Sequence, residues 1–71
     1  MPNQLENKVF KIIEVVGCSS QSIEDAIQCA INRASETLQH LAWFEVGEIR
    51  GYIEDNKLYY EVIIRIGFKV V

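Results

Sequence analysis

The sequence has few of the residues that cross-link small chains or bind metals in them. Its two cysteines, Cys18 and Cys29, do not form a CxxC pair, and its one histidine, His40, completes no set of four zinc ligands. No apolar run approaches the ~20 residues that span a membrane, and no charged segment with a cleavage site indicates a secretion signal. We therefore expect a cytoplasmic chain with reduced thiols, no metal site and no membrane association.

An excess of basic residues is also absent. Seven Lys and Arg residues against ten Asp and Glu residues give a net charge of −3, and the basic residues are scattered singly. A protein that tracks nucleic-acid phosphates has a basic patch instead. The chain also lacks a nucleophile paired with a base, a group of metal ligands and a phosphate loop. The sequence therefore argues against nucleic-acid binding and against an enzyme, and we expect no catalytic residues.

Apolar residues, in contrast, are plentiful for the size of the chain. They make up 49% of 71 residues. A chain of this length buries only about 60% of the surface that its unfolded form exposes. Domains this small usually need an added source of stability, and without disulfides or a metal the remaining one is oligomerisation. We therefore expect a single domain that assembles with copies of itself.

The hydrophobic pattern predicts a strand followed by a helix. Residues 1–7 are polar and are expected to be flexible, whereas residues 8–71 form the domain. The β-branched and aromatic content of residues 8–16 predicts a strand that ends at Gly17. Ser20 or Ser22 can cap a helix that runs to about His40. Its apolar side chains share one arc of roughly 140°; they are Ile23, Ala26, Ile27, Ala30, Ile31, Ala34, Leu38 and Leu41.

Two long strands are expected after the helix, over residues 42–54 and 58–71, with residues 55–57 as the hairpin tip. The last strand alternates, so that Val62, Ile64 and Ile66 lie on the face that must cover the helix. The predicted fold class is α+β. Its element order is β-α-β-β, with a three-stranded antiparallel sheet and one helix across it.

The sheet face away from this helix is expected to be apolar and open. With Asn56 at the centre of the turn, the predicted cross-strand pairs on this face are Trp43–Lys69, Glu45–Gly67, Gly47–Arg65 and Gly51–Glu61. The apolar residues assigned to it are Trp43, Ile49, Ile53, Tyr59 and Ile63. One helix covers only one face, so a partner subunit or a planar ligand is expected to cover the other. Trp43 then either fills an interface or stacks on a ligand.

Five segments in order and spacing resemble the dodecin family. They are Ile-Glu-Val-Val-Gly (13–17), Ser-Ile-Glu-Asp-Ala-Ile (22–27), Arg-Ala-Ser-Glu-Thr-Leu (33–38), Trp-Phe-Glu-Val-Gly-Glu-Ile-Arg-Gly (43–51) and Ile-Arg-Ile-Gly-Phe (64–68). The resemblance covers about residues 8–70. It implies a sheet wrapped around one helix and twelve copies in a hollow homododecamer. It also implies storage or sequestration of flavins, riboflavin or FMN, in pairs stacked on a tryptophan, without turnover. Some bacterial members also bind coenzyme A.

The resemblance assigns two residues to the flavin ring. Trp43 occupies the stacking position, and Glu61 stands where the family has a glutamine that meets the pyrimidine edge of the flavin. An amide offers one donor and one acceptor, whereas a carboxylate offers acceptors only. Either Glu61 is protonated, or it pairs with a basic side chain or metal and the pocket has a different or weaker ligand. We therefore expect weakened, pH-dependent flavin binding.

Two basic residues complete the predicted site. Arg50 matches a family arginine near the flavin pocket, but strict alternation turns it away from the face of Trp43. Either a bulge near Gly47 redirects it or it is structural. Lys69 shares the face of Trp43 and matches a basic position that meets phosphate groups, so it serves an FMN or coenzyme A phosphate or is a solvated surface lysine. The alternative function is a flavin-free oligomer that binds another small ligand or ion or has a structural role.

Overall fold

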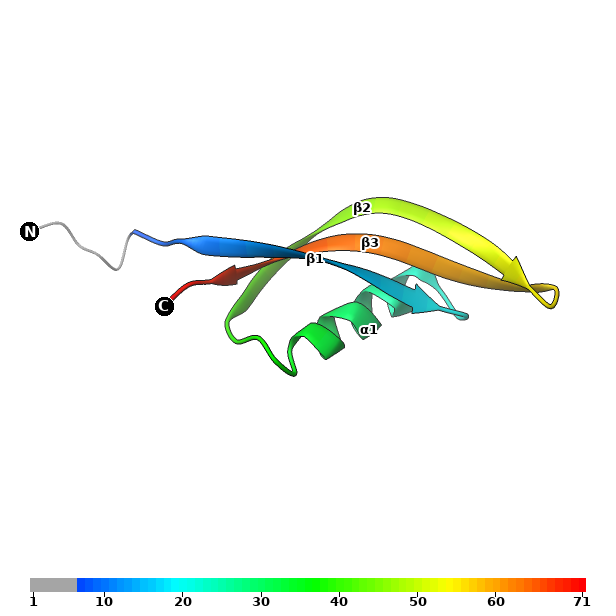
Figure 1. Cartoon of the computed structure of the whole chain (residues 1–71), viewed down its shortest axis with the longest axis horizontal. Coiled ribbons are helices and arrows are strands. Elements are labelled where there is room, and N and C mark those ends of the chain that lie inside the picture. The colour runs from blue at the N-terminus through cyan, green and yellow to red at the C-terminus, as the bar shows by residue number, and fades with distance from the viewer. Residues whose placement is uncertain (1–6) are drawn as a thin grey trace, which may run out of the picture.

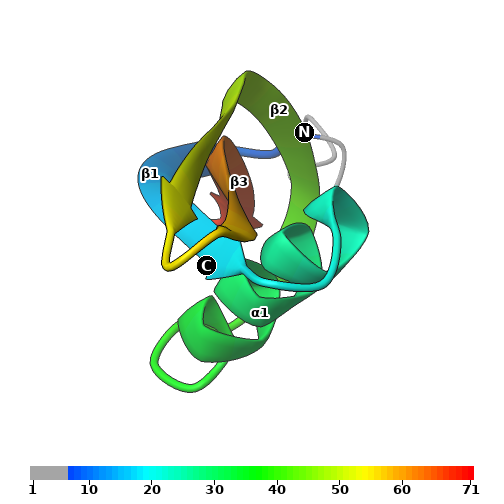
Figure 2. The same ribbon diagram turned by 90° about the vertical axis from the view of Figure 1, so that its right-hand side faces the viewer.

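The computed structural model describes residues 7–71 and contains four elements. They are β1 (Phe10–Ser19), α1 (Ile23–Ala34), β2 (Leu41–Glu54) and β3 (Lys57–Lys69). The strands form one antiparallel sheet in the order β1-β3-β2, and α1 lies across one face of it (Figures 1 and 2). The predicted α+β class and β-α-β-β order are confirmed. Apart from Asn7, the segment 1–7 that was expected to be flexible lies outside the described residues.

The core lies between α1 and the middle of β3. It consists of small residues on the helix and branched residues on the strand: Ala26, Ala30, Ala34, Val62, Ile64 and Ile66. The predicted face of β3 therefore does pack on the helix. Gly17 on β1 lies so close to α1 that an added Cβ would collide with the backbone carbonyl of Ala26. Small side chains on both elements thus let the helix approach the sheet closely.

The helix begins as predicted but ends earlier. The Ser22 Oγ accepts a hydrogen bond from the backbone N–H of Asp25 at 2.9 Å, which caps the first turn. The helix ends at Ala34, so the prediction that it continues to about His40 is wrong. The Ser35 hydroxyl donates to the carbonyl of Asn32 at 2.7 Å, and such side-chain bonds compete with helical pairing. Leu38 still packs on the core, which explains why its spacing fitted the helical pattern.

The hairpin between β2 and β3 has a two-residue tip, not the predicted three. Asp55 and Asn56 have φ angles of 53° and 64°, as a type I′ turn requires, and Lys57 already belongs to β3. Figure 1 shows this hairpin projecting at one end of the sheet, beyond α1. The short tip shifts the register relative to the prediction, because the pairing no longer centres on Asn56.

The register also changes inside β2. It shifts between Val46 and Ile49, as in a β-bulge, and again between Leu41 and Trp43. The four predicted pairs are therefore wrong: the structure pairs Trp43 with Gly67, Glu45 with Arg65, Arg50 with Glu61 and Gly51 with Tyr60. Beyond the bulge, Ile49 and Ile53 pair with Val62 and Leu58 and so lie on the helix side of the sheet, which corrects their assignment to the opposite face.

No helix in residues 7–71 is long and apolar enough to cross a membrane. Its single α-helix has 12 residues.

Candidate ligand-binding face

The side of the sheet turned away from α1, here called the uncovered face, carries the predicted site residues. The ladder pairings place on it Phe10, Ile12, Glu14, Val16 and Cys18 of β1, Trp43, Glu45, Arg50 and Tyr52 of β2, and Tyr59, Glu61, Ile63, Arg65, Gly67 and Lys69 of β3. Phe10, Ile12 and Val16 are 40–52% exposed. The expectation that this face is apolar holds only in part, because two of the five apolar residues assigned to it lie on the other side and ion pairs occupy part of it.

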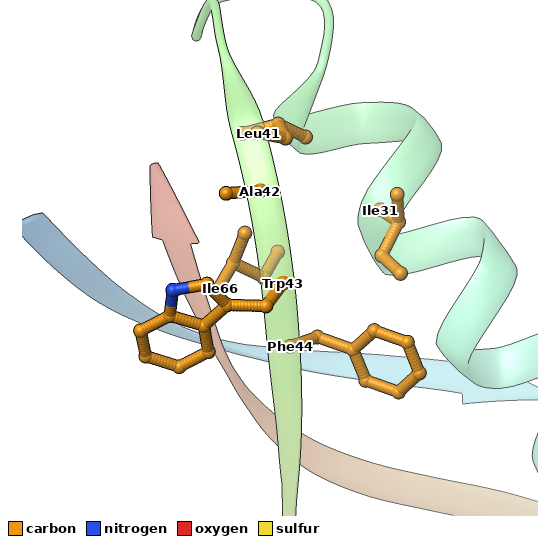
Figure 3. A pocket seen from close by; sticks show the side chains of 6 residues that line it. All are labelled: Ile31, Leu41, Ala42, Trp43, Phe44 and Ile66. Atoms are coloured by element: carbon orange, nitrogen blue, oxygen red, sulfur yellow. The ribbon is translucent and has the colours of Figure 1, made fainter. Parts of the chain in front are cut away.

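Trp43 lies against the backbone of β3 at Gly67. A Cβ at position 67 would collide with three carbons of the indole, so glycine is what lets the ring lie flat on the strand. The side chain is 41% exposed, which leaves the rest of the ring open. Figure 3 shows Trp43 and Phe44 pointing to opposite sides of β2, with Phe44 on the side of Ile31 and the helix.

An apolar hollow opens beside Trp43. It is lined by Ile31 of α1, Ile66 of β3 and the first residues of β2: Leu41, Ala42, Trp43 and Phe44 (Figure 3). Phe44 is 48% exposed here although its neighbours pack on the core. Nothing in residues 7–71 covers this hollow, so an apolar group from outside the chain can fill it.

Arg50 and Glu61 form the shortest ion pair described in residues 7–71. The Arg50 Nε donates to the Glu61 Oε1 at 2.6 Å, and this hydrogen bond, followed by the charge of Glu61, raises the pKa of the guanidinium. The Glu61 side chain is 23% exposed and that of Arg50 is 61% exposed. The bulge that the sequence left open for Arg50 is present, and it brings this residue onto the face of Glu61.

Cys18 approaches the same carboxylate from the other neighbouring strand. Its Sγ lies 3.7 Å from the Glu61 Oε2, in a long contact with the thiol as donor. Partial desolvation, and then the charge of Glu61, raise the pKa of this free thiol, so it stays protonated at neutral pH. Sequence reasoning missed this contact because the β1–β3 register that places Cys18 opposite Glu61 was not predicted.

A second charged group spans the three strands at Arg65. Its Nε donates to Glu45 on β2 at 2.8 Å, and one of its terminal nitrogens donates to Glu14 on β1 at 3.1 Å. These hydrogen bonds raise the pKa of the guanidinium. Exposed ion pairs of this kind contribute little to stability. Their effect is to keep the middle of the uncovered face polar, with two carboxylates around one guanidinium.

Two tyrosines stack at the hairpin end of this face. The rings of Tyr52 and Tyr59 have centroids 5.0 Å apart and are tilted by 9°. They border a shallow hollow that also includes Arg50, Ile53 and Leu58. The two-residue turn is the signal that could have found this pair, because it places residues 52 and 59 directly opposite each other.

Comparisons with known proteins agree on one family. The family model described as Dodecin matches residues 9–71. The chain belongs to the dodecin family. It is 50% identical over 64 residues to a dodecin of Thermus thermophilus, covering 89% of this chain and 93% of that protein.

Two solved structures extend this agreement to the fold. A Thermus thermophilus protein superposes with a TM-score of 0.86 at 47% identity, covering 92% of this chain and 97% of that one. A calcium dodecin from Mycobacterium tuberculosis, described as having a novel calcium-binding site, superposes with a TM-score of 0.80 at 26% identity, covering 89% and 91% of the two chains. The arrangement of three strands and one helix is thus the dodecin arrangement.

The four residues expected to bind the ligand fall into two groups on the uncovered face. Lys69 is exposed and lies two residues beyond Gly67 on β3, so its predicted place on the face of Trp43 is confirmed. Glu61 and Arg50 form the other group, six residues before Gly67. At ~3.3 Å per residue this separates them from Trp43 by about 20 Å, much longer than a tricyclic ring. One copy of the chain therefore does not bring all four residues onto one ring.

Proposed function

We propose that the chain binds a flavin, riboflavin or FMN, without turning it over, in a homododecameric shell of the dodecin type that stores or sequesters it. Membership of the dodecin family supports this proposal. The observation that carries it is the indole of Trp43, which lies flat on Gly67 on the uncovered face with part of its ring open. Such a ring suits a flat aromatic partner, and stacking of this kind is worth about 1–3 kcal/mol per ring.

Self-assembly is supported by apolar surface that the chain leaves open. The helix is about 18 Å long at 1.5 Å per residue, whereas β3 spans about 43 Å at ~3.3 Å per residue. The hairpin end therefore projects beyond α1, and Ile49, Ile53 and Leu58 on its helix side are 50%, 72% and 59% exposed. Copies of the chain that pack there would bury this surface.

Assembly would also bring together the two groups of site residues that lie far apart in one copy. If Trp43 and the Arg50–Glu61 pair both contact one flavin, they come from different copies, because about 20 Å of strand separates them in one copy. The site is then incomplete in a monomer. Lys69 lies near Trp43 and provides a positive charge for the phosphate of FMN or, as in some family members, of coenzyme A. For Glu61, pairing with a basic side chain is the favoured state, because Arg50 contacts it at 2.6 Å.

A fluorescence titration tests the proposal. We expect the assembled protein to quench riboflavin fluorescence, and we expect the quenching to reach a plateau as the binding sites fill. Trp43→Ala should weaken binding by about 10- to 100-fold, because the stacking partner is lost. Trp43→Phe keeps a ring over Gly67 and controls for assembly, which light scattering measures. Glu36→Gln, on the exposed turn after α1, is the matched control outside the site and should bind as the native chain does.

The possible outcomes separate the two candidate functions. An assembled native protein that leaves riboflavin fluorescence unchanged would overturn the flavin proposal and favour the flavin-free oligomer. A monodisperse monomer in dilute buffer, with or without riboflavin, would overturn the site shared between copies. Calcium receives no support from the described residues, because 7–71 contain no group of three His, Cys, Asp or Glu side chains that could hold a metal ion.

A further inference from the structure

Two open apolar surfaces lie on the helix side of the sheet, at opposite ends of it. One is the overhang, which consists of Ile49, Ile53 and Leu58 on the hairpin that projects beyond α1 (Figure 1). The other is the apolar hollow between Ile31 of α1 and the first residues of β2, where Phe44 is half exposed (Figure 3). At ~3.3 Å per residue, about 30 Å of β2 separates Phe44 from Ile53, so one copy cannot place its own overhang in its own hollow.

The two ends also carry opposite charges. Residues 48–61, which form the hairpin end, include four Asp and Glu residues and two Lys and Arg residues, and 2 − 4 gives a net charge of −2. The end with the apolar hollow carries three exposed lysines, Lys8, Lys11 and Lys69. Surfaces of opposite charge attract one another and favour one orientation of approach. The charges therefore favour contact between the hairpin end of one copy and the opposite end of another.

Lys11 places one of these charges at the border of the apolar hollow. It pairs with Phe68 of β3, which in turn pairs with Leu41, a residue of the hollow. Ile13, two residues further along β1, packs on the core, so alternation puts Lys11 on the helix side as well. An acidic hairpin that entered the hollow would thus meet a positive charge at its rim.

We propose that the overhang of one copy docks in the apolar hollow of a second copy, with the acidic hairpin end of the first beside the lysines of the second. The contact is head to tail because it joins two different surfaces, and such contacts close into rings when the rotation between copies allows it. The inference rests on the proposed self-assembly and specifies which surfaces meet.

This contact leaves the ligand face open. Trp43 and Phe44 point to opposite sides of β2 (Figure 3), so a hairpin packed on Phe44 covers the helix side while the indole stays on the uncovered face. A small ligand in the apolar hollow would leave the overhang in water. A second copy covers both surfaces, because every copy has one overhang and one hollow.

Two variants that each block one half of the contact test the proposal. Ile53→Glu places a charge on the overhang, and Phe44→Glu places one in the hollow. Both side chains are exposed in a single copy, so the protomer should still fold, which far-UV circular dichroism checks. Phe44→Ala provides the same test without an added charge. In sedimentation velocity at equal protomer concentration, each variant should form smaller species than the native protein, whereas Glu36→Gln should assemble as the native protein does.

An equimolar mixture of the two glutamate variants distinguishes a head-to-tail contact from a symmetrical one. Phe44→Glu keeps an intact overhang and Ile53→Glu keeps an intact hollow. The mixture should therefore form a species of about twice the mass that either variant reaches alone. A mixture with no larger species than its components would overturn the proposal, as would native-size assembly of either variant by itself.

A charge exchange tests the orientation of the contact. Lys11→Glu should raise the protomer concentration at half-assembly by about three- to tenfold, because it repels the acidic hairpin of the next copy. Adding Glu54→Lys to the same chain should recover most of this loss, since the attraction returns with its signs exchanged. A double variant that assembles no better than Lys11→Glu would contradict the pairing of the two ends.

Riboflavin quenching separates this contact from ligand binding. A Phe44→Glu protein that assembles as the native one does but no longer quenches riboflavin would assign the hollow to the ligand and overturn the contact. Native protein whose assembly depends on Phe44 and Ile53 but which leaves riboflavin unquenched would contradict flavin binding and still support the contact.

Discussion

The two faces of the sheet use the same strands but are held by different forces. On the covered face, Val62, Ile64 and Ile66 are at most 1% exposed and pack on the alanines of α1. On the uncovered face, the alternate residues of β3 include Glu61 and Arg65, each in cross-strand ion pairs. Burial stabilises the first face, whereas exposed ion pairs add little to the second.

This difference assigns stability to one face and recognition to the other. The covered face is completed within a single copy, so its residues are expected to control unfolding. The uncovered face has an open indole, unused hydrogen-bonding groups and apolar side chains on β1 that its own chain leaves exposed. Its residues are expected to control binding and assembly. Substitutions at matched positions on the two faces can test this division.

The largest expected effect is in the core. Ile64→Ala should lower the free energy of unfolding by about 2–5 kcal/mol, because it leaves a cavity where the side chain is fully buried. Ile63→Ala, one residue earlier and on the uncovered face, should lose less. Denaturant unfolding at equal protomer concentration measures both, since assembly makes stability depend on concentration. Equal losses would contradict the division.

Two glycines give a matched pair with a smaller effect. In Gly17→Ala, the new Cβ meets the backbone carbonyl of Ala26, which cannot rotate away, so α1 must shift at a cost of about 1–3 kcal/mol. In Gly67→Ala, the obstacle is the Trp43 side chain, which can change rotamer. We expect a smaller loss of stability for Gly67→Ala but a displaced indole.

Tryptophan fluorescence and riboflavin quenching distinguish the two glycine variants. Gly67→Ala should shift the emission of Trp43 and reduce quenching. Gly17→Ala should leave both nearly unchanged while lowering the unfolding midpoint. A Gly17→Ala variant that loses quenching at native stability would show that the covered face also controls the ligand site.

Much of the covered face could be predicted from the sequence. The helical spacing of alanine and isoleucine and the alternation of β3 identify residues that pack on one another, because each pattern follows from a local backbone period. Leu38 shows the limit of this method. Its spacing fits a helix, yet it reaches the core from the turn that follows Ala34, since the core attracts an apolar side chain from either conformation.

The uncovered face could be predicted less well because its geometry depends on register. Two positive φ angles at Asp55 and Asn56 shorten the turn, and the bulge before Ile49 then reverses which side chains share a face. Neither the turn nor the bulge produces a periodic spacing of apolar residues that could be recognised in the sequence. The family resemblance indicated Trp43 and Glu61, but only the register shows that they lie about 20 Å apart in one copy and that Arg50 joins Glu61.

The smallest expected effect concerns the thiol beside Glu61. Cys18→Ser replaces a weak S–H donor with a stronger O–H donor to the Glu61 Oε2, which competes with the ring N–H of the ligand. We expect riboflavin affinity to fall by about two- to threefold, and Cys18→Ala to leave it unchanged or slightly raised. Fluorescence titration at pH 7 measures both variants. A tighter complex with serine would mean that the ligand does not use this oxygen.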